Sequence, residues 1–529
     1  MLLALPDTRA TWLIYAAFLA LVALLFFFDL SGLPLDTHDE DYFRDSADAL
    51  ENPTAFFAPD KRMPGRPALE LVLLLQYLAW GENPAAYHLC GGLLHLVAAL
   101  VLARAGRALG LELALALLTG LLFLINVSHF NAVHWISAQC YALVLICGCL
   151  AQCAYLLNRP LLVYALLLVA MLFHIAAAAF LPFFFYLAWR RGDPSAFRRY
   201  LPLGILLATL ALGLKLGYPQ APQTSVVAAG FAPWGVLRNL LICWSRLFST
   251  AHWLPHPLHL FAVWEWVTGA VALLACVAFQ WRYRFPLSEW QAWILVHLLP
   301  PLLLAPAYIQ TIPSGPSRYL YLSSAGIAGL LAWTLRQLAA RVPMLSRPIL
   351  TLLVILVSWT SYIGLEKATA ITHYAAGRHY LADHQLDQGI LELSRAIAIA
   401  PETIDLEDAY VRLVPMLYNR GDQRADSTLA AALGRFPQNH TLRLMRLALD
   451  SLGPIAGAEP ARRQLDSFKR SRGVARLIAE IYYHLGRGRQ NQDDRAEALS
   501  AFRRSLEFEP QRAQTQQGLS AALALPANP

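Results

Sequence analysis

Long apolar runs dominate the first two thirds of the chain. A hydrocarbon layer about 30 Å thick requires roughly 20 apolar residues per helix, and the sequence contains about eleven runs of suitable length. They cover residues 12–29, 87–106, 109–126, 136–156, 160–173, 175–189, 201–217, 262–280, 290–306, 320–338 and 349–365. The pattern predicts an all-α, polytopic membrane domain over residues 1–365. The first run follows a start with only Arg9 and has no small-residue cleavage site, so we expect a retained helix rather than a signal peptide.

Arginine residues are unevenly distributed among the connections between these runs. One set of alternate connections holds Arg104, Arg107, Arg159, Arg190, Arg191, Arg198, Arg199, Arg282, Arg284, Arg336, Arg341 and Arg347. After the first loop, the other set holds only Arg238, Arg246 and Arg318. Cytoplasmic loops of membrane proteins carry an excess of basic residues, so this asymmetry predicts a cytoplasmic N-terminus. An odd number of spans then places residues 366–529 on the outer side of the membrane.

Composition supports a division of the chain into two parts. Hydrophobic residues make up 57% and charged residues 15%, which excludes a soluble single-domain enzyme. Of the 42 basic and 35 acidic residues, 40 fall in the 164 residues from Glu366 onward. The net charge of +7 is explained by membrane topology and requires no nucleic-acid partner. The seven cysteines lie in or beside apolar runs, which indicates core residues and no disulfide framework.

From Glu366 the pattern changes to amphipathic helices with a recurring spacing. A small residue is followed by an apolar residue at +4, a small residue at +7 and a proline at +12. The copies are Gly389, Leu393, Ala396, Pro401; Ala425, Leu429, Ala432, Pro437; and Ala498, Phe502, Ser505, Pro510, with a degenerate copy at Ala461, Leu465, Phe468, Gly473. Small residues let the two helices of a hairpin approach closely, and the proline ends the second helix.

This spacing resembles tetratricopeptide (TPR) repeats, and it predicts an α-solenoid of three to four units over residues 366–529. Such arrays offer a concave surface to peptides or partner proteins. The sequence leaves two roles open for it: capture of a polypeptide substrate, or a packing and oligomerisation module.

The first outer loop is strongly acidic. Eight of the sixteen acidic residues of the membrane domain fall between Asp36 and Asp60, and residues 36–42 read DTHDEDY. Carboxylates at the outer membrane surface could act where an acceptor hydroxyl meets a lipid-borne donor, because partial desolvation raises the pKa of a carboxyl group and suits it to be a general base. The alternative is an ordinary solvated acidic loop.

Further motifs accompany this loop in a fixed order. Arg66-Pro67 ends it, residues 81–88 read GENPAAYH, and His95 follows on the same helix. The second outer loop reads HFNAVHWIS over residues 129–137, and residues 317–323 read SRYLYLS. These stretches resemble the integral-membrane glycosyltransferases of the C type (GT-C), in the branch that joins a protein O-mannosyltransferase-like membrane domain to TPR repeats. That family shows an acidic pair before a tyrosine, then YRPL, G-x-NP-x-x-YH, HPxHxEAVAWIS and ERYLYLPS.

The sequence departs from the family pattern at several carboxylates. Alignment on the tyrosine puts His38 and Asp39 at the acidic pair, so the pair can also be Asp39 with Glu40 or Asp41. Asn131 stands for the glutamate of HxEAV, and Ser317 stands for the glutamate before RYLYL. The lysine-glutamate pair before the proline of a middle span is absent, and His174 lies nearby.

The resemblance implies an enzyme that uses a polyprenyl-phosphate sugar. Asp39 would accept the proton of the acceptor hydroxyl, assisted by Asp41 or Glu40. Arg318, and second Arg66, would stabilise the leaving phosphate, because a guanidinium donates in a planar fork.

Supporting residues follow from the same resemblance. Tyr319 and Tyr321 would line the lipid-phosphate groove, with His38, His95, His129 and His134 in supporting positions. If a divalent cation such as Mg²⁺ or Mn²⁺ takes part, Asp39 and Glu40 would hold it. The structural alternatives are that Arg318 is an interfacial anchor and that His95 is a packing residue.

The leading functional hypothesis is transfer of a sugar to protein Ser or Thr hydroxyls, as in O-mannosylation, with the repeats presenting the polypeptide. A second hypothesis keeps the chemistry but uses a glycan or lipid head group as acceptor. A third is a non-catalytic membrane scaffold that recruits partners through its repeats. The compact loops favour a bacterial inner membrane, with the repeats in the periplasm.

Overall fold

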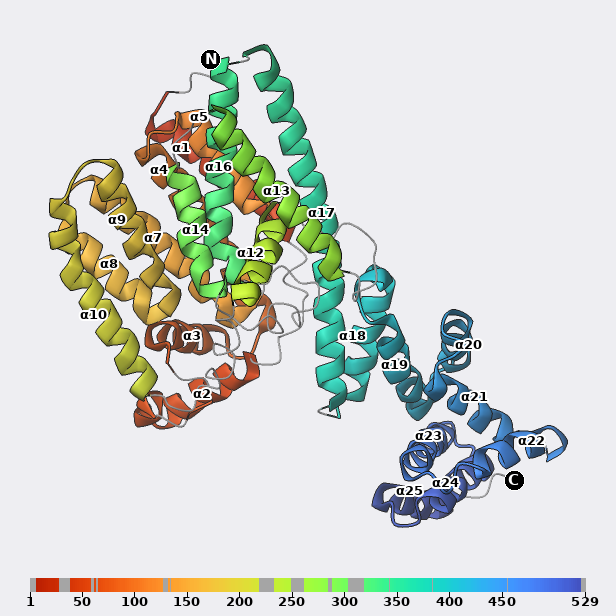
Figure 1. Cartoon of the computed structure of the whole chain (residues 1–529). Coiled ribbons are helices and arrows are strands. Elements are labelled where there is room, and N and C mark those ends of the chain that lie inside the picture. Colours follow the sequence, from red (N-terminus) through yellow and green to blue (C-terminus); the bar gives the residue numbers. More distant parts are fainter. Residues whose placement is uncertain are drawn as a thin grey trace. The chain divides into compact units, whose positions relative to one another are not determined.

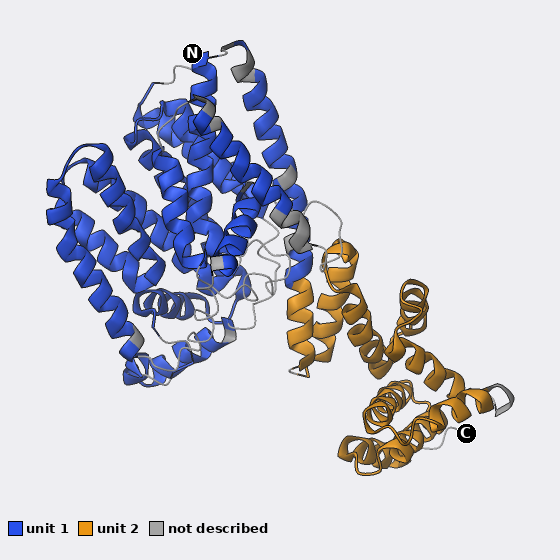
Figure 2. Cartoon of the chain, in the orientation of Figure 1, with its two compact units in different colours: residues 1–372 blue, residues 373–529 orange. Residues whose placement is uncertain are grey.

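The structure is a computed structural model. It describes the chain apart from residues 1–5, 28–38, 59–60, 63–64, 127–131, 134, 218–232, 249–260, 284–287, 303–317, 342, 383, 454 and 525–529. Every regular element formed by the described residues is a helix, which confirms the all-α class (Figure 1). The chain forms two compact units, residues 1–372 and 373–529 (Figure 2). The division falls inside one helix, α17 (Pro343–Ala382).

A helix occupies each range that the sequence predicts as a span. These helices are α1 (Arg9–Phe27), α4 (Pro84–Ala108), α5 (Leu113–Leu124), α7 (Gln139–Leu156), α8 (Pro160–Phe173), α9 (Phe180–Arg190), α10 (Ser195–Gly217), α13 (Phe261–Tyr283), α14 (Glu289–Leu302), α16 (Tyr321–Arg341) and α17. By length and composition, five helical stretches of the described chain could each cross a membrane: Arg9–Phe27, Pro84–Ala108, Ile136–Leu156, Ser195–Leu214 and Pro348–Ala382. The structure is therefore consistent with a membrane protein, and the total of eleven spans stays a prediction.

The first loop contains helices that the span pattern does not predict. Helix α2 (Asp39–Glu51) carries the acidic run and is followed by the 3₁₀ turn η2 (Pro53–Phe57). Helix α3 (Pro67–Trp80) is apolar but only 14 residues long. It begins at Pro67 because a proline at the first helical position loses no intrahelical hydrogen bond. A further helix, α12 (Pro233–Phe248), lies between α10 and α13.

Contacts among described residues identify two ends of the first unit. At one end Asp7 pairs with Arg107 at 3.0 Å, and Arg336 donates to the carbonyl oxygen of Gly110 at 3.2 Å. At the other end α2 and α3 pack together near the start of α7 (Figure 1). We call these the Arg107 end and the Asp39 end.

Small residues bring the central helices into close contact. A Cβ on Gly148 of α7 would lie 1.9 Å from the ring of Phe180, and one on Gly329 of α16 would lie 2.1 Å from the ring of Trp290. Glycines at helix interfaces allow this approach in membrane proteins, where close van der Waals packing drives helix association. These contacts bring α7 against α9 and α16 against α14.

The second unit is a series of packed helices. They are the end of α17, α18 (Leu386–Ile399), α19 (Leu406–Arg420), α20 (Ala425–Arg435), α21 (His440–Leu452), α22 (Ile455–Asp466), α23 (Arg472–Asn491), α24 (Arg495–Phe508) and α25 (Ala513–Ala524). The repeat signature falls on alternate helices, α18, α20, α22 and α24. Its central apolar residues, Leu393, Leu429, Leu465 and Phe502, are all buried. Each copy of the spacing therefore places a buried apolar residue on a helix.

The order of helix contacts departs from a regular solenoid. Helix α19 packs directly on α23, where a Cβ on Gly488 would lie 1.7 Å from the carbonyl oxygen of Tyr418. The side chain of Asn491 donates to the carbonyl oxygen of Asn419 at 2.8 Å. This contact bypasses the hairpin of α21 and α22, whereas each repeat of a regular solenoid contacts only its neighbours. The assignment as a TPR solenoid therefore stays a prediction.

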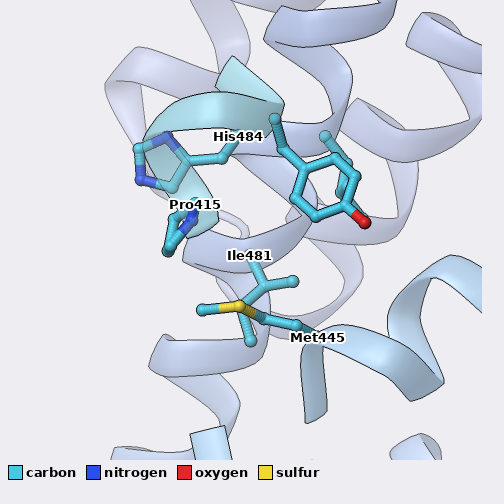
Figure 3. A pocket seen from close by; sticks show the side chains of 6 residues that line it. Pro415, Met445, Ile481 and His484 are labelled. Carbon is cyan, nitrogen blue, oxygen red and sulfur yellow. The ribbon is translucent and has the colours of Figure 1, made fainter. Parts of the chain in front are cut away.

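A small pocket lies where α19, α21 and α23 meet (Figure 3). It is lined by Pro415, Tyr418, Met445, Ile481, His484 and Leu485. Nδ1 of His484 is already hydrogen-bonded to Nδ2 of Asn419 at 2.7 Å. The pocket is therefore mainly an apolar gap between packed helices.

Candidate functional site

Asp39 is the first residue of α2, and its side chain is completely buried. The backbone N–H of Ser137 donates to its Oδ1 across 3.4 Å. A buried carboxylate is costly unless donors compensate the lost hydration, so this position marks Asp39 out from the other acidic residues of the loop. Asp41 is half-buried on the same helix. The side chain of Glu40 and the whole of His38 lie outside the described residues.

Arg318 reaches the same segment from the far end of the sequence. It begins the 3₁₀ turn η9 (Arg318–Leu320), which leads into α16. Its guanidinium lies over the ring of Trp135 at 4.0 Å, and its Nη2 donates to the Tyr319 hydroxyl at 3.0 Å. Trp135 precedes Ser137 by two residues, so the short segment 135–137 contacts both Asp39 and Arg318.

Arg66 contributes a second guanidinium. It is the N-cap residue of α3, and its backbone N–H donates to Oε1 of Glu70 at 2.8 Å. Glu70 also forms a buried ion pair with Lys61, which holds the loop before α3. The Arg66 side chain interacts electrostatically with Tyr42 and Tyr141.

Part of the acidic run has a structural role. Arg62 pairs with Asp45 at 3.2 Å and with Asp48 at 2.8 Å, which ties the loop before α3 to α2. Asp48 is more than half exposed, so this pair adds little stability by itself. The solvated-loop alternative therefore fits Asp48, whereas it does not fit the fully buried Asp39.

Tyr42 lies one turn after Asp39 on α2 and is buried. Burial raises the pKa of Tyr42 to about 12, although the nearby Arg66 guanidinium opposes the shift. Its hydroxyl therefore stays protonated at physiological pH. Tyr42 is therefore an uncharged group close to the charged side chains of Asp39 and Arg66.

His174 is a further member of the cluster and lies in the connection between α8 and the 3₁₀ turn η5 (Ile175–Ala179). Its Nδ1 accepts the backbone N–H of Ala176 at 3.0 Å, and its Nε2 lies 3.4 Å from the hydroxyl of Tyr141. Burial, together with the positive charges of Arg66 and Arg318, holds the pKa of His174 well below its usual range. The two guanidinium groups thus act on one neutral imidazole.

Three helices begin at this cluster. Helix α3 starts after Arg66, α7 starts two residues after Ser137, and α16 starts after η9. The N-terminal end of a helix carries a partial positive charge and unpaired backbone N–H groups. With two guanidinium groups beside them, these ends make a setting that favours an anion next to a buried carboxylate.

The remaining predicted residues have different outcomes. Tyr319 lies in the cluster as the hydrogen-bond partner of Arg318. His95 and Tyr321 are fully buried and bonded to each other at 2.9 Å, and His95 also bonds to the carbonyl oxygen of Leu124 at 3.0 Å. These contacts fit the packing alternative for His95. His129 and His134 lie outside the described residues.

The prediction for a metal concerns Asp39 and Glu40. Within the described part of the chain, no three His, Cys, Asp or Glu side chains come together in a group that could hold a metal ion.

Two members of the cluster, Tyr42 and Tyr141, were not predicted as site residues. Tyr42 ends the acidic run, and its position one helical turn after Asp39 was a usable signal once a helix was assumed there. Tyr141 lies inside an apolar run and carries no such signal. It is found only because the first turn of α7 faces His174 and Arg318.

Comparison of the chain with models of known protein families, with curated protein sequences and with solved structures finds no match.

Proposed function

We propose that the protein is an inverting glycosyltransferase of the GT-C type that moves a sugar from polyprenyl phosphate to an acceptor hydroxyl. The single observation that carries the proposal is that Asp39 and Arg318 contact the same segment, residues 135–137. Transfer from a phosphate leaving group requires a proton acceptor and a fixed cation in one site, and their shared contact with this segment supports that arrangement. A second support is the order of the motifs along the sequence, which resembles the order in the GT-C family.

The reaction assigns a role to each charged group. Asp39 takes the proton of the acceptor hydroxyl while the hydroxyl oxygen attacks the anomeric carbon of the sugar. The bond from that carbon to the phosphate oxygen breaks, and its electron pair stays on the phosphate. Arg318 and Arg66 stabilise this charge by donating hydrogen bonds. One displacement inverts the anomeric configuration and leaves no covalent enzyme intermediate.

The site suits a donor held in the membrane. In this proposal the Asp39 end faces the outer compartment and the Arg107 end faces the cytoplasm, in keeping with the positive-inside rule. The outer compartment, here the bacterial periplasm, lacks nucleotide sugars, whereas a polyprenyl carrier delivers an activated sugar through the bilayer. The acceptor is a protein hydroxyl, with the second unit selecting the polypeptide.

A transfer assay tests this proposal. Purified full-length protein in lipid nanodiscs is expected to move mannose, or another hexose, from its polyprenyl phosphate to Ser and Thr residues of periplasmic proteins, read by mass spectrometry. The same reaction with EDTA shows whether a divalent cation takes part. Transfer to glycan or lipid acceptors alone would contradict the protein-acceptor assignment, and no transfer with any donor would leave a non-catalytic scaffold as the better account.

The role of the second unit makes a separate prediction. A chain that ends at Ala382 keeps α17 complete but lacks α18 to α25. We expect it to bind polyprenyl phosphate like the full chain and to lose most transfer to folded protein acceptors, because the binding surface for the polypeptide is gone. Equal glycoprotein output from the shortened and full-length chains would contradict a presenting role.

A further inference from the structure

The hydrogen-bond directions around Tyr141 can be assigned from geometry. A backbone N–H can only donate, so the bond from Ala176 to His174 Nδ1 requires an unprotonated Nδ1. The neutral imidazole then carries its proton on Nε2. That Nε2 lies 3.4 Å from the Tyr141 hydroxyl, so the histidine donates and the tyrosine oxygen accepts.

The guanidinium of Arg318 is the second polar neighbour of the same hydroxyl group. A guanidinium has five N–H donors and no acceptor, so it cannot accept a hydrogen bond from the Tyr141 hydroxyl. Neither the imidazole nor the guanidinium can therefore accept the proton of the Tyr141 hydroxyl. Its own proton must point to a third group, and the described residues place no acceptor there.

We propose that Tyr141 is a hydrogen-bond donor to the phosphate of the lipid-linked donor, and that His174 is the positioning residue that directs its proton. This inference rests on the proposed function and adds a residue to it. Tyr141 is buried, with 4% of its surface exposed, and it lies in the first turn of α7 beside Arg318. A phosphate oxygen held by Arg318 would therefore be within reach of the same hydroxyl.

The contribution is greatest in the transition state. As the bond to the anomeric carbon breaks, negative charge grows on the phosphate oxygen, and a donor already aligned by His174 needs no rearrangement to stabilise it. The tyrosine keeps its proton throughout, so no further acid or base is needed. The cationic Arg318 polarises the O–H bond and strengthens its donation.

Three variants test the proposal in the full-length protein. Tyr141→Phe removes the donor and keeps the ring, and we expect it to lower kcat about 30-fold. His174→Asn keeps an oxygen that can cap Ala176 but cannot reach Tyr141, and we expect it to lower kcat about 10-fold. His174→Gln keeps an N–H near the Nε2 position and is expected to recover most of that loss.

The decisive readout is the combination of Tyr141→Phe with His174→Asn. If the histidine acts only through the tyrosine, the double variant is no slower than Tyr141→Phe alone. A histidine with a purely structural role would give additive losses, which would overturn the proposal, as would wild-type kcat in Tyr141→Phe. Binding of sugar-free polyprenyl phosphate, measured in parallel, distinguishes failure of this inference from failure of the proposed function. If wild-type protein binds polyprenyl phosphate and transfers sugar, and Tyr141→Phe has the same kcat, this inference alone is refuted. If wild-type protein neither binds polyprenyl phosphate nor transfers sugar, the proposed function is refuted as well.

Discussion

Replacing Asp39 by Asn is expected to lower the rate of sugar transfer by about 10³-fold, the scale of a lost general base. Asparagine has the same shape and retains an oxygen that can accept the Ser137 N–H, so the local structure should persist. It cannot take a proton from the acceptor hydroxyl. The expected loss therefore appears in kcat, with little change in donor binding, in the transfer assay described above.

Asp48→Asn is the matched control for this variant. Asp48 lies on the same helix, but its carboxylate is largely exposed and pairs with Arg62. The control should stay within about twofold of wild type, because exposed ion pairs contribute little. Wild-type activity in Asp39→Asn, or a large loss in Asp41→Asn alone, would show that Asp39 is not the base.

Replacing Arg318 by Gln is expected to lower kcat by about 10³-fold, and by Lys by about 10²-fold, the range measured for lost oxyanion donors. Gln removes the charge. Lys keeps the charge but loses the planar fork and the stacking on Trp135. Both variants should also weaken binding of polyprenyl phosphate, which separates them from Asp39→Asn.

Arg336→Lys is the control for the arginine variants. Arg336 lies on α16, the helix that follows Arg318, but at the Arg107 end, where it contacts the Gly110 carbonyl. We expect wild-type transfer from it. Equal losses in Arg336→Lys and Arg318→Lys would indicate a general effect on α16 and would contradict a phosphate-binding role for Arg318.

The helices of this fold were largely predictable, because each apolar run is long enough to enforce a helix. A helix lies in each of the eleven predicted ranges, and the spacing alone located buried repeat residues such as Leu393 and Phe502. Contacts between helices were harder to predict from the sequence. The packing of α19 on α23 depends on Gly488 meeting the backbone of Tyr418, and a repeat pattern describes only neighbouring hairpins.

The candidate site was predictable in part for a similar reason. Asp39, Arg66 and Arg318 could be selected because each lies in a motif that resembles the GT-C pattern. Tyr141 could not be selected, because a tyrosine inside an apolar run is an ordinary core residue until its partners are known. The contact between His95 and Tyr321 is equally invisible in the sequence, since 226 positions separate the two residues.

The central claim is that Asp39 and Arg318 share one site that holds a lipid phosphate. An experimental structure of the protein in nanodiscs with polyprenyl phosphate tests it most directly. We predict a phosphate within hydrogen-bonding distance of the Arg318 guanidinium, with the Asp39 carboxylate on the side where an acceptor would enter. A phosphate bound at the Arg107 end, or a distance between these two side chains too great to enclose one sugar phosphate, would contradict the account.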